Sequence, residues 1–101
     1  VEEVDEGDEI AKALGDKKVA ILQNHGILTT GPSVDIALWF YMSMERCCQA
    51  QLMAESAGKP ISVSHETAIK TREFIANDIA AWASYQPAFD KIIKMQPDLL
   101  D

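Results

Sequence analysis

Two short apolar runs separated by a three-residue break constrain the fold of this chain most strongly. Residues 19–22 form a continuous run rich in β-branched side chains, and residues 27–30 form a second β-prone run beyond Asn24-His25-Gly26. Gly26 adopts a positive φ at low energetic cost, which allows a tight reversal of the chain. The pattern predicts two strands, paired as a β-hairpin, with His25 presented at their turn.

Helical signals surround this hairpin. The longest covers residues 33–57, with Ser33 as the N-cap and Gly58 at the end. Its apolar residues cover most sides, which predicts burial against a sheet and also against either a missing part of the domain or a second subunit. Shorter helices are predicted over residues 8–14, capped by Asp8, from Ser64 towards Trp82, and within residues 87–97.

Length and charge exclude several classes of protein. The chain has 101 residues, 48% of them hydrophobic, and begins with Val1, so we expect one domain or a piece of a longer protein. Nine basic residues are scattered among 16 acidic ones, giving a formal charge of −7, and we predict no nucleic-acid partner. No apolar run reaches membrane-spanning length, so we predict no membrane partner. The acidic first nine residues are typical of a solvated, mobile segment.

The side chains able to do chemistry are few. Cys47 and Cys48 are adjacent and rarely close a disulfide, which favours core packing and a reducing, cytoplasmic compartment. We interpret Glu45 as an ion-paired or exposed helix residue, and His65 as a solvent-facing helix start. No complete metal or catalytic motif is present. On residue type alone, His25 is either a turn histidine bonded to backbone, a metal ligand or an acid/base group.

A longer motif runs through the hairpin and into the long helix. It reads Val19-Ala-Ile-Leu-Gln-Asn24-His25-Gly26-Ile-Leu-Thr-Thr-Gly31-Pro-Ser33, with Met44-Glu45 in the helix that follows. This series resembles the C-terminal portion of the class II aldolase/adducin head domain. The resemblance implies an α/β fold in which a hairpin-like pair of strands packs with three to four helices. It also implies that residues 1–101 are the C-terminal part of one such domain.

By this resemblance His25 is a ligand of a catalytic zinc or another divalent metal. The other ligands, a His-x-His pair, and the acid/base glutamate of the family lie in a part that precedes this chain, as do its phosphate-binding loops. No catalytic residue and no organic cofactor site can therefore be assigned within residues 1–101. A divalent metal that chelates a hydroxyl and a carbonyl oxygen acts as a Lewis acid when a C–C bond breaks or a proton leaves.

The resemblance leads to one functional hypothesis and leaves two others open. The leading one is a metal-dependent lyase that acts on a small sugar or hydroxy-carbonyl substrate, possibly phosphorylated, by aldol cleavage or epimerisation. Enzymes of this family form homotetramers, and we expect residues 1–101 alone to be inactive. The first alternative is a non-catalytic scaffold of the adducin type, because fold does not determine function. The second is an autonomous acidic binding module.

Overall fold

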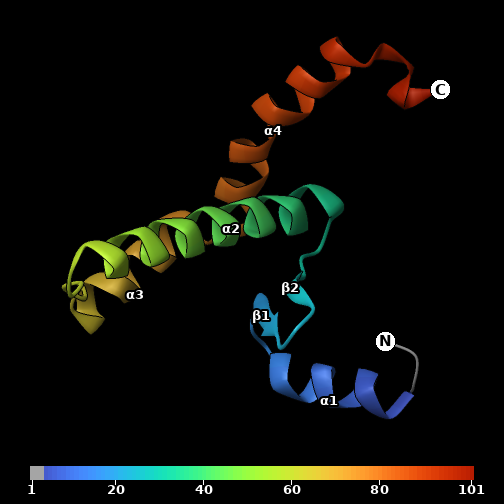
Figure 1. The fold of residues 1–101 in the computed structure, drawn as a ribbon. Helices are drawn as coiled ribbons and strands as arrows, with labels where there is room; N and C mark the ends of the chain where they lie inside the picture. Colours follow the sequence, from blue (N-terminus) through green and yellow to red (C-terminus); the bar gives the residue numbers. More distant parts are fainter. Residues whose placement is uncertain (1–3) are drawn as a thin grey trace.

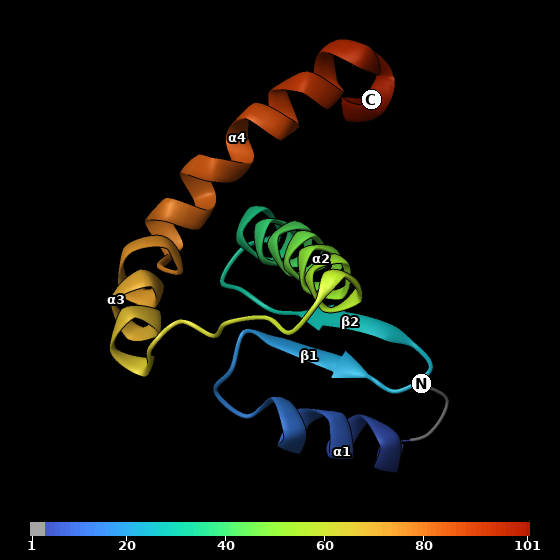
Figure 2. The same ribbon diagram turned by 60° about the vertical axis from the view of Figure 1, so that its left-hand side comes forward.

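The computed structural model describes residues 4–101 and contains a two-stranded sheet, four α-helices and one 3-10 helix. The elements follow the chain as α1 (Val4–Leu14), β1 (Val19–Leu22), β2 (Gly26–Thr29), α2 (Val34–Ala57), α3 (His65–Ile75), α4 (Asp78–Met95) and η1 (Pro97–Leu100). Figures 1 and 2 show α1 on one side of the strand pair and α2 on the other. The predicted α/β arrangement of a strand pair with three to four helices is confirmed.

The strand pair is the predicted hairpin. β1 and β2 run antiparallel, with Val19 opposite Thr29 and Leu22 opposite Gly26. The pairing extends one step further, because the Thr30 amide donates to the Lys18 carbonyl oxygen over 2.9 Å. Since both runs are β-prone and the break between them tolerates a tight reversal, the local sequence is sufficient to form this unit.

The long helix α2 begins and ends as the sequence predicts. The Ser33 hydroxyl accepts a hydrogen bond from the Ile36 amide, and Gly58 follows the last helical residue. The helix packs against the strands and against α4. The Thr29 hydroxyl also donates to the Ala37 carbonyl oxygen over 2.8 Å, which fixes β2 to the first turns of α2.

The N-terminal helix α1 is longer than predicted. It begins by Val4, so Asp8 lies inside the helix and the prediction of Asp8 as its N-cap is wrong. The acidic residues after position 3 are helical rather than part of a mobile segment; residues 1–3 lie outside the described part of the chain. The physical reason is that Asp5 and Glu6 lie in the first turn, where the helix dipole favours negative charge, while Ile10 and Leu14 are partly buried.

The C-terminal third also differs from its prediction. The expected single helix from Ser64 to Trp82 is two helices, because Asn77 accepts a hydrogen bond from the Ala80 amide and starts α4. The helix α4 then continues through Pro87 rather than restarting after it. Proline lacks one backbone donor, and the surrounding turns hold the helix together despite that loss.

The buried core of the described residues is small. Ile36 and Phe40 of α2 pack with Ala81 of α4, and Val19, Trp39 and Ala76 lie against this cluster. The predicted burial of α2 on most sides is not found within residues 4–101, because several of its apolar side chains remain exposed. These are Val34, Leu38, Tyr41, Leu52 and Met53. None of the helices in the described part is both long and apolar enough to cross a membrane.

Candidate functional site

The loop between β1 and β2 presents His25 at the end of the strand pair. Asn24 adopts φ 61° and Gly26 adopts φ 142°, both in the positive region that few residues tolerate. The His25 amide donates to the Leu22 carbonyl oxygen over 3.2 Å, which closes the turn. The imidazole itself remains accessible, with 59% of the side chain exposed. Backbone geometry therefore fixes the base of His25 and leaves its ring free to bind.

A carboxylate from α1 lies beside this ring. Glu6 Oε1 is 3.9 Å from His25 Nε2, although the two residues are 19 positions apart. Residues of α1, β1 and the turn line an open pocket of about 370 Å³ beside this pair of side chains. Its lining combines these two polar side chains with apolar ones and with a second carboxylate: Glu6, Glu9, Ile10, Ala13, Ile21, Leu22, Gln23 and His25.

The donor chemistry at the turn suits one part of a divalent metal site. An imidazole nitrogen is a common zinc ligand, and structural or catalytic zinc takes three or four protein ligands. Residues 4–101 hold no group of three or more His, Cys, Asp or Glu side chains arranged to bind a metal. His25 therefore fits the role of one ligand, while a complete set requires donors beyond the described residues.

The other candidate residues do not join His25. Glu45 is exposed on α2, and His65 is exposed at the first position of α3. Cys47 and Cys48 are both free thiols, as their adjacency predicts, but Cys47 is exposed and Cys48 is only partly buried, so the expected core packing is not found within residues 4–101. Both cysteines line a separate, mainly apolar pocket of about 450 Å³ between β1 and α2, together with Ile21, Met44, Gln51 and Leu52.

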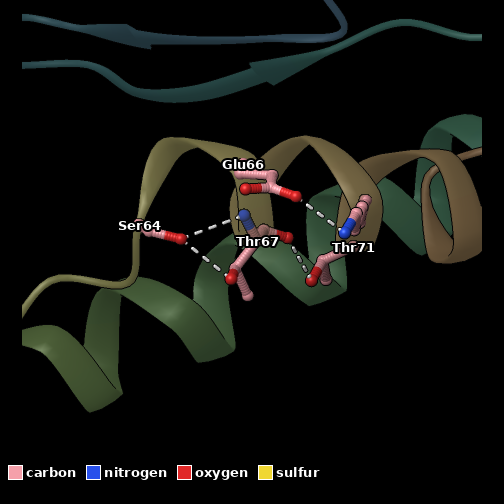
Figure 3. A network of polar contacts seen from close by, with 5 residues as sticks. Ser64, Glu66, Thr67 and Thr71 are labelled. Carbon is pink, nitrogen blue, oxygen red and sulfur yellow. Dashed lines mark hydrogen bonds and ion pairs between the residues drawn. The ribbon is translucent and has the colours of Figure 1, made fainter.

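The polar residues at the start of α3, labelled in Figure 3, have a structural explanation. The Ser64 hydroxyl accepts from the Thr67 amide over 3.2 Å and donates to the Thr67 hydroxyl over 2.9 Å. Lys70 and Glu66 form an ion pair of 2.8 Å one turn apart. These contacts begin and stabilise α3, so this network is a helix cap and not a second site.

Glu6 is the site residue that the sequence interpretation missed. It lies in an acidic stretch that is typical of solvated segments, and no short spacing connects position 6 with position 25. The available signal was the apolar spacing of Ile10, Ala13 and Leu14, which indicates that a helix packs on the strands. Extending that helix by one turn towards the N-terminus makes Glu6 helical, but residue spacing alone does not place it beside the turn.

Comparison with known proteins identifies the family. Residues 1–52 match the family described as Class II Aldolase and Adducin N-terminal domain. The decarboxylase NovR of Streptomyces niveus is 38% identical over 95 residues, which cover 94% of this chain and 35% of that protein. A 4-hydroxy-3-prenylphenylpyruvate oxygenase/4-hydroxy-3-prenylbenzoate synthase of Streptomyces roseochromogenus subsp. oscitans is 36% identical over 95 residues, 94% of this chain and 34% of that protein.

A solved structure has the same arrangement of elements. The L-fuculose 1-phosphate aldolase from Glaciozyma antarctica PI12 superposes with a TM-score of 0.87 and 36% sequence identity, over 90% of this chain and 36% of that one. The chain spans about a third of the length of each of these three proteins. With half of its residues matched by the family and its strands and helices superposed on an aldolase, the chain belongs to the class II aldolase and adducin family and has the aldolase fold.

Proposed function

We propose that residues 1–101 are the C-terminal part of one class II aldolase/adducin-type domain, and that the longer protein, called here the parent, is a metal-dependent carbon–carbon lyase. Its proposed substrate is a small hydroxy-carbonyl compound, such as a sugar phosphate. One observation carries the proposal: a chain of this family holds an accessible His25 on a turn whose backbone is fixed by Asn24 and Gly26.

His25 is the proposed metal ligand within this chain. A ligand must keep its position while substrate binds and product leaves, and the closed hairpin turn provides that stiffness. The ring must also be accessible, which it is. The remaining ligands and the acid/base group come from the part of the parent beyond these residues. A divalent metal held there would supply Lewis-acid stabilisation of the negative charge that develops on a carbonyl oxygen.

The open pocket beside His25 supports a small polar substrate. Ile10, Ala13 and Leu22 give its lining apolar groups, while Gln23 and His25 offer polar ones. A site of this kind orients a ligand by a few polar contacts and excludes water by apolar ones. Glu6 and Glu9 make the same wall acidic, so we expect any anionic group of the substrate to lie on the side of the metal away from α1.

The reaction type is tested by product analysis. Aldol cleavage of a hydroxy-carbonyl compound yields two carbonyl products, whereas a decarboxylase releases carbon dioxide. One similar protein is named an aldolase and another a decarboxylase, so the aldehyde product and carbon dioxide should both be assayed. We expect the purified parent to cleave a substrate from a panel of phosphorylated ketoses, to lose activity in a chelator, and to regain it with divalent metal.

Substitutions make that assay specific. His25→Ala is expected to lower kcat/KM at least a hundredfold, while His65→Ala, at the other histidine, leaves it within twofold. If the parent releases carbon dioxide and forms no aldehyde, its reaction is a decarboxylation and not an aldol cleavage. Full activity of His25→Ala would contradict the proposed role of this residue. A parent that folds without metal and shows no activity would favour the adducin-type scaffold.

We also propose that the parent is cytoplasmic and assembles as a homotetramer. The two free thiols suit a reducing compartment. Exposed apolar side chains on α2 and α4, among them Leu52 and Trp82, suit burial by further protein. Light scattering of the parent tests the assembly, and a monomer would contradict it.

A further inference from the structure

We propose that Glu6 is a positioning residue for His25, which fixes the orientation and the tautomer of the imidazole while its other nitrogen binds the metal. This inference rests on the proposed function, because it assigns a role to a residue that supports the proposed ligand. The sequence motif around His25 does not include Glu6.

The geometry selects Glu6 among the acidic residues. Within the described residues it is the only carboxylate that lies within 4.0 Å of a His25 ring nitrogen. Glu9, one turn further along α1, lines the same pocket without forming this contact. The two partners come from elements packed on each other, because α1 lies against β1 and the turn follows β1 directly.

The chemistry of imidazole explains what such a partner does. A neutral histidine has one protonated nitrogen, which donates, and one bare nitrogen, which binds a metal. A carboxylate beside Nε2 favours a proton on that nitrogen and leaves Nδ1 with its lone pair. Carboxylate partners of this kind orient metal-bound histidines and raise their basicity, and removing them typically lowers metal affinity by about 10 to 100-fold.

The observed separation is a close approach of the two side chains and not a hydrogen bond. At 3.9 Å the two atoms are farther apart than a direct hydrogen bond, which needs about 2.7–3.2 Å. Both side chains have room to rotate, since they are 59% and 44% exposed. We expect the contact to shorten when the other ring nitrogen is held by a metal, because the ring then loses its freedom to turn.

The experiment compares four forms of the parent: wild type, Glu6→Gln, Glu9→Gln and His25→Ala. Each metal-free protein is titrated with Zn²⁺ and, separately, with Co²⁺, whose visible absorption reports ligand geometry. Glu6→Gln is expected to weaken metal binding about 10 to 100-fold and to shift the Co²⁺ absorption band. Glu9→Gln removes the same charge from the same helix and pocket wall, and its metal affinity and Co²⁺ spectrum are expected to match those of wild type.

The outcomes separate this inference from the proposed function. Wild-type affinity and an unchanged Co²⁺ spectrum in Glu6→Gln, with binding lost in His25→Ala, would overturn the role of Glu6 and leave His25 as a ligand. Equal weakening in Glu6→Gln and Glu9→Gln would show a general charge effect and also overturn it. A loss in Glu6→Gln as large as that in His25→Ala would make Glu6 a ligand instead. If wild type binds no metal, both proposals fail.

Discussion

The side-chain amide of Gln86 donates a hydrogen bond of 2.9 Å to the carboxylate of Asp35, joining residues 51 positions apart. Asp35 lies in the first turn of α2, and Gln86 lies in α4, where the same amide also donates to the Trp82 carbonyl oxygen over 3.1 Å. The contact is partly buried and ties α4 to the end of α2 that follows the hairpin. It therefore helps to hold the C-terminal helix against the small core.

Removing this contact is expected to destabilise the protein. Gln86→Ala should lower the free energy of unfolding by about 1–2 kcal/mol, because it leaves a partly buried carboxylate without its donor. Gln51→Ala is the matched control, since among residues 4–101 the Gln51 amide bonds only to the exposed Glu55 on the same helix. Urea unfolding of the parent measures both. Equal effects of the two substitutions would contradict a specific role for the Gln86–Asp35 contact.

The aromatic residue at the centre of the core should dominate stability. Phe40→Ala is expected to cost about 3–5 kcal/mol, because it opens a cavity beside Ile36 and Ala81. It also removes the ring over which Lys18 Nζ lies, 5.6 Å from the centroid. Phe74 is 82% exposed on α3, and its replacement by Ala should cost much less. Thermal unfolding of both variants checks the contrast; a larger loss from Phe74→Ala would mean that the core lies elsewhere.

Two glycines should respond in opposite directions to alanine. A Cβ at Gly31 would lie 2.9 Å from Ile36 Cγ2 and 3.0 Å from the Ala37 amide nitrogen, so Gly31→Ala should destabilise by about 1–3 kcal/mol. Gly7 lies inside α1, and apart from the adjacent helix backbone no atom of residues 4–101 lies within 4 Å of such a Cβ, so Gly7→Ala should stabilise by about 0.5–1 kcal/mol. The denaturant midpoint of each variant measures its stability. If both midpoints move in the same direction, the predicted contrast between Gly31 and Gly7 is wrong.

Local signals predicted those parts of the fold in which the sequence alone determines the backbone. The hairpin around Gly26 and the cap at Ser33 are of this kind, and both are confirmed. The divided C-terminal helices are not, because apolar spacing continues across Asn77 and only the capping bond to Ala80 reveals the break. The passage of α4 through Pro87 runs against the intrinsic cost of proline in a helix, and the turns on either side keep the helix continuous.

The candidate site was predicted only in part for a related reason. His25 stands out because it interrupts two β-prone runs, so the local sequence draws attention to it. Glu6 reaches the ring only because α1 packs across β1, and such a contact between distant segments has no signature in residue spacing. The acidic composition around Glu6 also favours a solvated segment, which conceals a residue with a specific neighbour.

Metal content tests the central claim most directly. The parent, its His25→Ala variant and its His65→Ala variant would each be purified, dialysed against a trace of divalent metal and analysed by elemental mass spectrometry. We predict about one divalent ion per subunit in the parent and in His65→Ala, and almost none in His25→Ala. A parent without bound metal, or a His25→Ala variant with unchanged metal content, would contradict the claim that His25 is a metal ligand.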